Sequence, residues 1–362
     1  MPNFAGQLNA NEIFAGLYNM IIFSQEVFAD NVAEAGDELV DMARVDGSLY
    51  GDTKLYYASD ALKSAPWGND AEAMNLLKLN RPDAPKCQAI ELDKFRQISL
   101  TVDDYLTKRA WASEGAFSSF NSIMLGWIRD TKRIYDSTTY NAYIGTAQST
   151  IGKQTITITL PTNENDKEAE ARLQAQTIAK EMGDLLVNLK DVTRDYNDYG
   201  FIRSFRASDL IVVWNSEALN KITKMDLPTI FHKDGLIAKM GEYTLPARYF
   251  GTVNAEATTG NGTTVRSLIE QDITKTSSPT VHVFAGDLIP NGYQAPAGTS
   301  YTVDSKVLFK IMHRRSVPYM SAFEVGTSFF NPKSLTENHY LTWGHNTLEY
   351  LKNYPMITVK SN

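Results

Sequence analysis

The chain has 362 residues, enough for one large or two medium-sized domains with a sizeable core. Hydrophobic residues make up 43% and charged residues 21%, which excludes disorder over the whole length. The formal net charge of −7 excludes general electrostatic wrapping of nucleic acid, which needs a basic surface.

The N-terminal region, residues 1–45, is predicted to be helical, with Phe14, Leu17 and Ile21 on one face. Such a segment packs on its own domain or reaches to a neighbour as an arm, and the sequence leaves both open. Its first residues lack the basic lead and the apolar core of a signal peptide. We therefore expect a protein that is made and kept in a reducing cytoplasm and has no membrane span.

Turn signals and alternating apolar residues between positions 51 and 106 predict a long hairpin with a partly polar tip. A two-stranded hairpin is only marginally stable by itself in water. Its side chains need a surface to lie on, and a neighbouring subunit is a natural candidate.

Two helices and a strand follow in the middle of the chain. Aromatic and aliphatic residues at three- and four-residue steps predict a long helix over 113–136. Strict alternation predicts a strand over 155–160, and a second helix is expected over 163–190. The first turns of that helix are acidic, which suits the positive end of the helix dipole.

An apolar run over 210–214 predicts a buried strand, and Asn215 and Ser216 are predicted to end it and to cap a following helix. Residues 251–302 are rich in Gly, Ser and Thr and are expected to form exposed loops on short strands such as 280–284. Strands are predicted again over 340–343 and 356–359.

The polar residues support no catalytic, cofactor-binding or metal-binding site. His339 and His345 share a face of a predicted strand, but no other ligand stands at a recognised spacing, so surface or interface histidines are expected. The carboxylates at Asp103, Asp195 and Asp198 fall at a strand end and in a loop, where solvated side chains are common. The single cysteine, Cys87, excludes an intrachain disulfide and is expected to be a small hydrophobe or a strand residue.

Aromatic and basic residues supply the candidates for contacts between subunits. His313 opens the densest basic cluster, for which a structural or intersubunit ion-pair role is expected. Tryptophans flank the predicted hairpin and suit a core or an interface. The candidate contact residues are Trp67, Phe95, Trp111, Arg314 and Arg315.

Three segments carry a resemblance to a known family: residues 113–143, residues 210–236, and the stretch from Phe329 through the Asn331-Pro332 turn to Trp343. In this order they resemble the spine helix, a central strand and helix, and a late aromatic strand of tailed-phage major capsid proteins. The chain is most similar to the coat proteins of small, short-tailed, protein-primed phages. The implied fold is α+β, of the Hong Kong 97 type.

The resemblance implies a division of the chain, in which each part takes its name from the family. The parts are an N-terminal arm (1–50), an extended loop (51–107), a peripheral domain (108–150 and 311–349) and an axial domain (151–310 and 350–362). The axial domain contains a loop-rich insertion, residues 254–302, that is longer than a minimal axial domain requires.

The resemblance also implies the function. The chain is expected to be a structural protein of the virion that is no enzyme, assembles in the host bacterial cytoplasm into pentamers and hexamers, and encloses double-stranded DNA without sequence-specific binding. Its implied partners are copies of itself and scaffolding, portal and decoration proteins. Two alternatives stay open: an encapsulin-type compartment shell, and an enzyme with an unrecognised loop-built active site.

Overall fold

The computed structural model describes residues 38–47, 53–64, 79, 81–103, 114–146, 154–163, 165–223, 240–254, 280–282, 300–304 and 306–362. The predicted arm helix and most of the loop-rich insertion lie outside these residues. Two five-stranded sheets and two long helices form the described body, which confirms the α+β class.

The first sheet has the strand order β1-β11-β12-β3-β2. Its strands are β1 (Arg44–Asp46), β2 (Thr53–Ala58), β3 (Lys86–Asp103), β11 (Tyr319–Asn331) and β12 (Thr336–Asn346). All neighbours are antiparallel except β1 and β11. β3 pairs with β2 through Lys86–Glu91 and with β12 through most of its remaining length, so one strand joins the predicted hairpin to the sheet.

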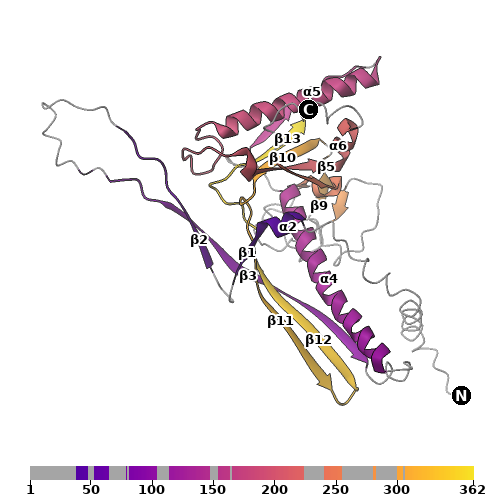
Figure 1. Cartoon of the computed structure of the whole chain (residues 1–362). Helices are drawn as coiled ribbons and strands as arrows, with labels where there is room; N and C mark the ends of the chain where they lie inside the picture. The colour runs from indigo at the N-terminus through magenta and orange to yellow at the C-terminus, as the bar shows by residue number, and fades with distance from the viewer. Residues whose placement is uncertain are drawn as a thin grey trace.

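One face of this sheet is covered by α4 (Glu114–Thr146), a helix of 33 residues and about 50 Å that runs along it (Figure 1). Ile128 and Tyr135 of the helix pack on Leu341 and Trp343 of β12. The short helix α2 (Glu38–Ala43) contacts α4, and its buried residues join a core with the end of α4.

The second sheet has the order β4-β13-β10-β5-β6. Its strands are β4 (Thr155–Ile158), β13 (Met356–Ser361), β10 (Val307–His313), β5 (Leu210–Asn215) and β6 (Gly241–Leu245). The inner strand β5 is buried at every position because both faces are covered. Leu210, Val212 and Trp214 face α5, whereas Ile211 and Val213 face the end of α4.

Two helices, α5 and α6, cover one face of the second sheet (Figure 1). The helix α5 (Lys167–Lys190) begins after the cap Asp166, whose side chain accepts hydrogen bonds from the backbone N–H groups of Glu168 and Ala169. The helix α6 (Ser216–Thr223) follows β5 directly, and the Asn215 side chain accepts a bond from Glu217 N, as the sequence predicted. The short 3-10 helices η3 (Ala207–Asp209) and η5 (Ala247–Tyr249) flank β5 and β6.

A third sheet is small, with the order β7-β9-β8. Its strands are β7 (Gly251–Asn254), β8 (Thr280–His282) and β9 (Ser300–Val303); β7 and β9 lie at the two ends of the loop-rich insertion, and β8 lies within it. β8 agrees with the strand predicted from residue 280.

The C-terminal end of α4 ties the two main sheets together. The Lys310 side chain is 2% exposed, and its Nζ donates to Ile144 O at 2.7 Å and to Gly145 O at 3.0 Å. Tyr140 Oη donates to Val317 O at 3.0 Å, between β10 and β11. A buried ammonium at the negative end of the helix dipole stabilises this junction.

Candidate assembly surfaces

The first candidate surface is the ribbon, defined as residues 53–64 and 81–91. It consists of β2, the first part of β3 and the residues beyond them, and it extends away from α4 and the β11–β12 hairpin (Figure 1). Large apolar side chains on it are exposed: Leu55, Tyr57 and Leu62 by 52%, 66% and 80%. Exposed apolar side chains on a thin element have no core of their own to join, so they mark a contact surface.

The base of the ribbon is held by Asp60. Its Oδ2 accepts a bond from Arg194 Nη1 at 2.7 Å, and its Oδ1 accepts from Ile202 N and Ala61 N, each at 2.9 Å. The backbone N–H of Ile202, followed by the Arg194 side chain, lowers the pKa of Asp60 to about 2. The carboxylate is therefore ionised at neutral pH.

The opposite strand of the ribbon is held by Gln88. Its Nε2 donates to Tyr350 O at 3.0 Å, and its Oε1 accepts from Lys352 N at 3.0 Å. Arg203 completes the attachment, because its Nη2 donates to Ser59 O at 2.8 Å and its Nε donates to Asn353 Oδ1 at 2.9 Å. Both strands of the ribbon are thus bonded to the body.

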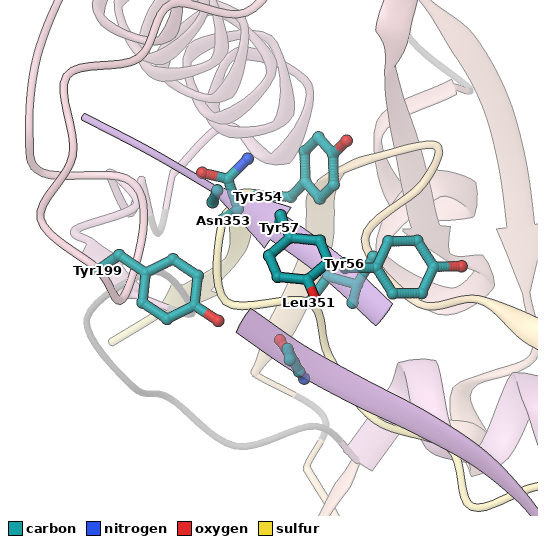
Figure 2. A pocket seen from close by; sticks show the side chains of 8 residues that line it. Tyr56, Tyr57, Tyr199, Leu351, Asn353 and Tyr354 are labelled. Carbon is teal, nitrogen blue, oxygen red and sulfur yellow. The ribbon is translucent and has the colours of Figure 1, made fainter. Parts of the chain in front are cut away.

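A small cavity of about 40 Å³ lies at the same place. Figure 2 shows its lining, to which the ribbon contributes Tyr56 and Tyr57 and the body contributes Tyr199 and Tyr354. The volume has room for one or two water molecules and is far below the several hundred Å³ of a ligand pocket. This cavity is a packing gap at the ribbon base and no substrate site.

The second candidate surface is the far end of the β11–β12 hairpin. Phe329, Phe330 and Leu335 are 62%, 47% and 43% exposed, and we call them the tip patch. Leu335 has φ 53°, a left-handed conformation that is strained for a side chain with a Cβ. An exposed apolar residue held in a strained conformation is a feature that packing within this chain does not explain.

The part of the open face of the first sheet that β3 and β12 form carries several uncharged polar side chains. Alternation along β3 and β12 turns Gln97, Thr101, Asn338 and Thr342 away from α4. Their side chains bond across the strands, with Gln97 Nε2 to Thr342 Oγ1 at 3.0 Å and Thr101 Oγ1 to Asn338 Oδ1 at 2.6 Å. Since its polar groups are paired, this face is stable in contact with water.

The structure describes three of the five predicted contact residues. Phe95 is half-buried against Leu92 of β3 and Met320 of β11, so it packs in the chain's own core. Arg314 and Arg315 are exposed in the turn after β10. Trp67 and Trp111 lie outside the described residues. The contact roles of these residues stay predictions.

The expectation of surface histidines is wrong for two of them. His313 stacks on Tyr354 with ring centroids 4.2 Å apart, and burial lowers its pKa to about 4. His345 is 2% exposed, its Nε2 lies 3.1 Å from Tyr135 Oη, and burial lowers its pKa as well. The burial of His345 could have been predicted from the sequence, because His345 lies two residues after the buried Trp343 and so points to the same face of the strand.

A buried ionic cluster at the start of the first sheet was also missed. Asp136 of α4 is fully buried, and its Oδ1 accepts from Tyr319 Oη at 2.5 Å. Lys132 Nζ and Arg44 Nη1 each lie 3.5 Å from Asp136 Oδ2. Lys132 lies over the sheet, where its Nζ is 3.1 Å from Glu324 Oε2 of β11.

Two searches of the described residues concern other kinds of site. No set of three or more His, Cys, Asp or Glu side chains in the described part of the chain is arranged to hold a metal ion. None of the helices among those residues is both long and apolar enough to cross a membrane.

Comparisons with known proteins identify the fold. No curated protein matches the chain. A chain of the capsid structure of Staphylococcus phage Andhra matches with a TM-score of 0.60 and 10% identity over 91% of this chain and 85% of that one. A chain from the structure of the head fibre and inner core protein of native bacteriophage P68 matches with a TM-score of 0.58 and 11% identity, over 88% and 83%.

These likenesses show that the chain has a phage capsid fold, which confirms the fold expected from the sequence. The model of the Phi29-like phage major capsid protein family matches residues 9–358, which is nearly the whole chain. This match favours neither the compartment shell nor the enzyme, because the family is structural. The chain belongs to the Phi29-like phage major capsid protein family and is a structural protein of the virion shell.

Proposed function

We propose that copies of this chain join into pentamers and hexamers through the ribbon and the tip patch, and that these close into a shell around double-stranded DNA. The observation that carries the proposal is the exposure of large apolar side chains on both projecting elements. Each Å² of apolar surface buried on a neighbour contributes about 25 cal/mol. Many repeated contacts of this kind give a stable closed assembly.

Charge supports enclosure of DNA without tight binding. The chain has a formal net charge of −7, and the open face of the first sheet presents paired hydroxyl and amide groups. Such a surface does not release counterions from DNA and so does not bind it strongly. We propose that the shell assembles in the host bacterial cytoplasm and that scaffolding, portal and decoration proteins complete it.

In this proposal, each of the two large sheets belongs to one domain of the shell protein. The first sheet with α4 forms the peripheral domain, and the second sheet with α5 and α6 forms the axial domain. The boundary expected at residue 311 falls inside β10 (Val307–His313), whose partners β5 and β13 both belong to the second sheet. We therefore place this boundary after His313.

Electron microscopy and sedimentation of the purified protein test the proposal. The parent is expected to form shells, tubes or hexamer sheets. A variant with Phe329→Ser and Phe330→Ser is expected to assemble at higher concentration, because it lacks the apolar tip. Val187→Ser is the matched control, since Val187 is 56% exposed on α5, away from both projecting elements.

A parent that stays a compact monomer at every concentration contradicts the proposal. If the Phe329→Ser, Phe330→Ser variant assembles at the same concentration as the Val187→Ser control, the tip patch is not an assembly contact. Particles filled with a protein cargo in place of DNA would point to the compartment alternative.

A further inference from the structure

The ribbon is bonded to the body at two separate points across its width. On one strand, Ser59 and Asp60 bond to the loop 194–203, and on the other strand Gln88 bonds to the segment 350–353. We call these contacts the clamp. One attachment would leave the ribbon free to pivot about it, whereas two attachments on opposite strands fix its direction.

The body side of the clamp is itself a single rigid unit. Asn197 is fully buried, and its side chain exchanges two hydrogen bonds with the backbone of Phe201, at 2.7 and 2.9 Å. Asp198 N donates to Lys352 O at 2.8 Å, which links the loop 194–203 to the segment 350–353. The two attachment points therefore cannot move independently of each other.

Beyond the clamp, toward residues 64 and 81, the ribbon is exposed. Residues 61–64 and 81–87 are all exposed, in contrast to the half-buried Gln88 and the buried Ala58 at the base. No packing among these described residues supports the direction in which the ribbon leaves the body. That direction depends on the clamp and on the continuation of β3 into the first sheet.

We propose that the clamp sets the angle at which the ribbon meets a neighbouring copy and thereby the curvature of the shell, with Asp60 as its main positioning residue. This inference rests on the proposed role of the ribbon as an intersubunit contact. Asp60 is central because it accepts bonds from the side chain of Arg194 and from two backbone N–H groups. An amide at this position would present an NH₂ group to one of these donors.

A small loss of direction has a large effect at a distance from the clamp. Six residues beyond it span about 20 Å, so a turn of about 10° moves the end by about 3–4 Å. A displacement of this size exceeds the tolerance of a hydrogen bond or a packed contact. In a closed shell, the angle between neighbouring copies determines whether the particle is small, large or open.

The first experiment measures the clamp in the unassembled chain. Spin labels at Leu62→Cys on the ribbon and Lys180→Cys on α5, with Cys87→Ser, report the ribbon direction as a distance distribution. Asp60→Asn and, separately, Gln88→Ala are expected to shift and broaden this distribution. Glu168→Gln is the matched control, because Glu168 forms an exposed ion pair with Arg172 at 3.0 Å on α5. The control is expected to leave the distribution unchanged.

The second experiment measures particle diameters of the same variants by electron microscopy. Asp60→Asn and Gln88→Ala are expected to give a shifted or broadened size distribution or open sheets, whereas Asp60→Glu is expected to restore part of the parent distribution. Unchanged distances in Asp60→Asn overturn the clamp. Changed distances with parent-sized shells overturn its role in curvature, and a parent that never assembles overturns the proposed function instead.

Discussion

Gly145 offers a sharp test of how the two sheets are joined. It lies in the last turn of α4, where a Cβ would stand 1.8 Å from the carbonyl oxygen of Tyr249 and 2.5 Å from its carbonyl carbon. Ordinary contact begins at 3.4 Å, so Gly145→Ala forces the helix and η5 apart by about 1.5 Å. The obstacle is backbone, and rotation of a side chain cannot relieve it.

The magnitude follows from three contributions. Alanine in a helix interior is favoured over glycine by about 1 kcal/mol. Overpacking of a buried contact costs about 1–3 kcal/mol, and the site is buried because Tyr249 is 4% exposed. Displacement of Gly145 O also weakens its charge-assisted bond with Lys310, which contributes about 1.5–3 kcal/mol. We expect a net loss of about 2–4 kcal/mol.

The control uses the same substitution in the same helix. Gly126 of α4 has nothing within 4 Å of the position that a Cβ would take. Gly126→Ala is therefore expected to raise the free energy of unfolding by up to about 1 kcal/mol. Urea unfolding of the unassembled variants, followed by circular dichroism, measures both values. An unfolding midpoint for Gly145→Ala at or above that of Gly126→Ala would refute this account of the junction.

Three further substitutions test other features of the fold. Lys310→Met removes the buried ammonium at the end of α4 and is expected to lower the free energy of unfolding by about 2–4 kcal/mol in urea titrations; a neutral effect would mean that apolar packing alone joins the sheets. His313 has a folded-state pKa below its unfolded value, so stability is complete above about pH 6.5 and falls as the pH drops toward 4, by up to about 3 kcal/mol. His313→Phe is expected to remove this part of the acid sensitivity in melting curves, and an unchanged pH slope would contradict burial of the neutral ring. Leu335→Gly relieves the strained conformation and is expected to stabilise the unassembled chain by about 1 kcal/mol while weakening assembly; a loss of both in calorimetry and sedimentation would argue against strain at this turn.

The parts of the fold that the sequence predicted are those whose signal is local. The run over 210–214 is apolar because both of its faces are covered, and Asn215 caps α6 with its own side chain. The alternation in 86–103 likewise predicted β3, together with its hairpin partner β2. In each case the residues that determine the element lie within it or next to it.

Element ends were predicted less well, because they depend on distant residues. The long helix predicted from periodicity ends at residue 136, whereas α4 continues to Thr146. Its last ten residues include threonines, tyrosines and a glycine, which are weak helix formers. They stay helical because Tyr140 bonds to Val317 O and Lys310 caps the last carbonyls, from positions more than 160 residues away.

The sequence predicted the strands that carry the candidate surfaces, but it did not predict the contacts that hold these strands in place. The hairpin and the late aromatic strand were predicted, but the clamp joins Asp60 to Arg194 across 134 residues, and no spacing rule connects them. The buried charges at Asp136 and Lys132 were also hidden, since their i,i+4 spacing is equally typical of a solvated helix face. Only the packing of the helix on the sheet distinguishes a buried pair of this kind from a solvated one.

The two sheets differ in how they are covered, and this difference suits a shell protein. The second sheet has packed cores on both faces, so it is stable without a partner. The first sheet is covered on one face by α4, and its hairpin and ribbon extend past that cover with exposed apolar side chains. In the proposed function these exposed side chains become buried only on a neighbouring copy, so assembly adds to the stability of both elements.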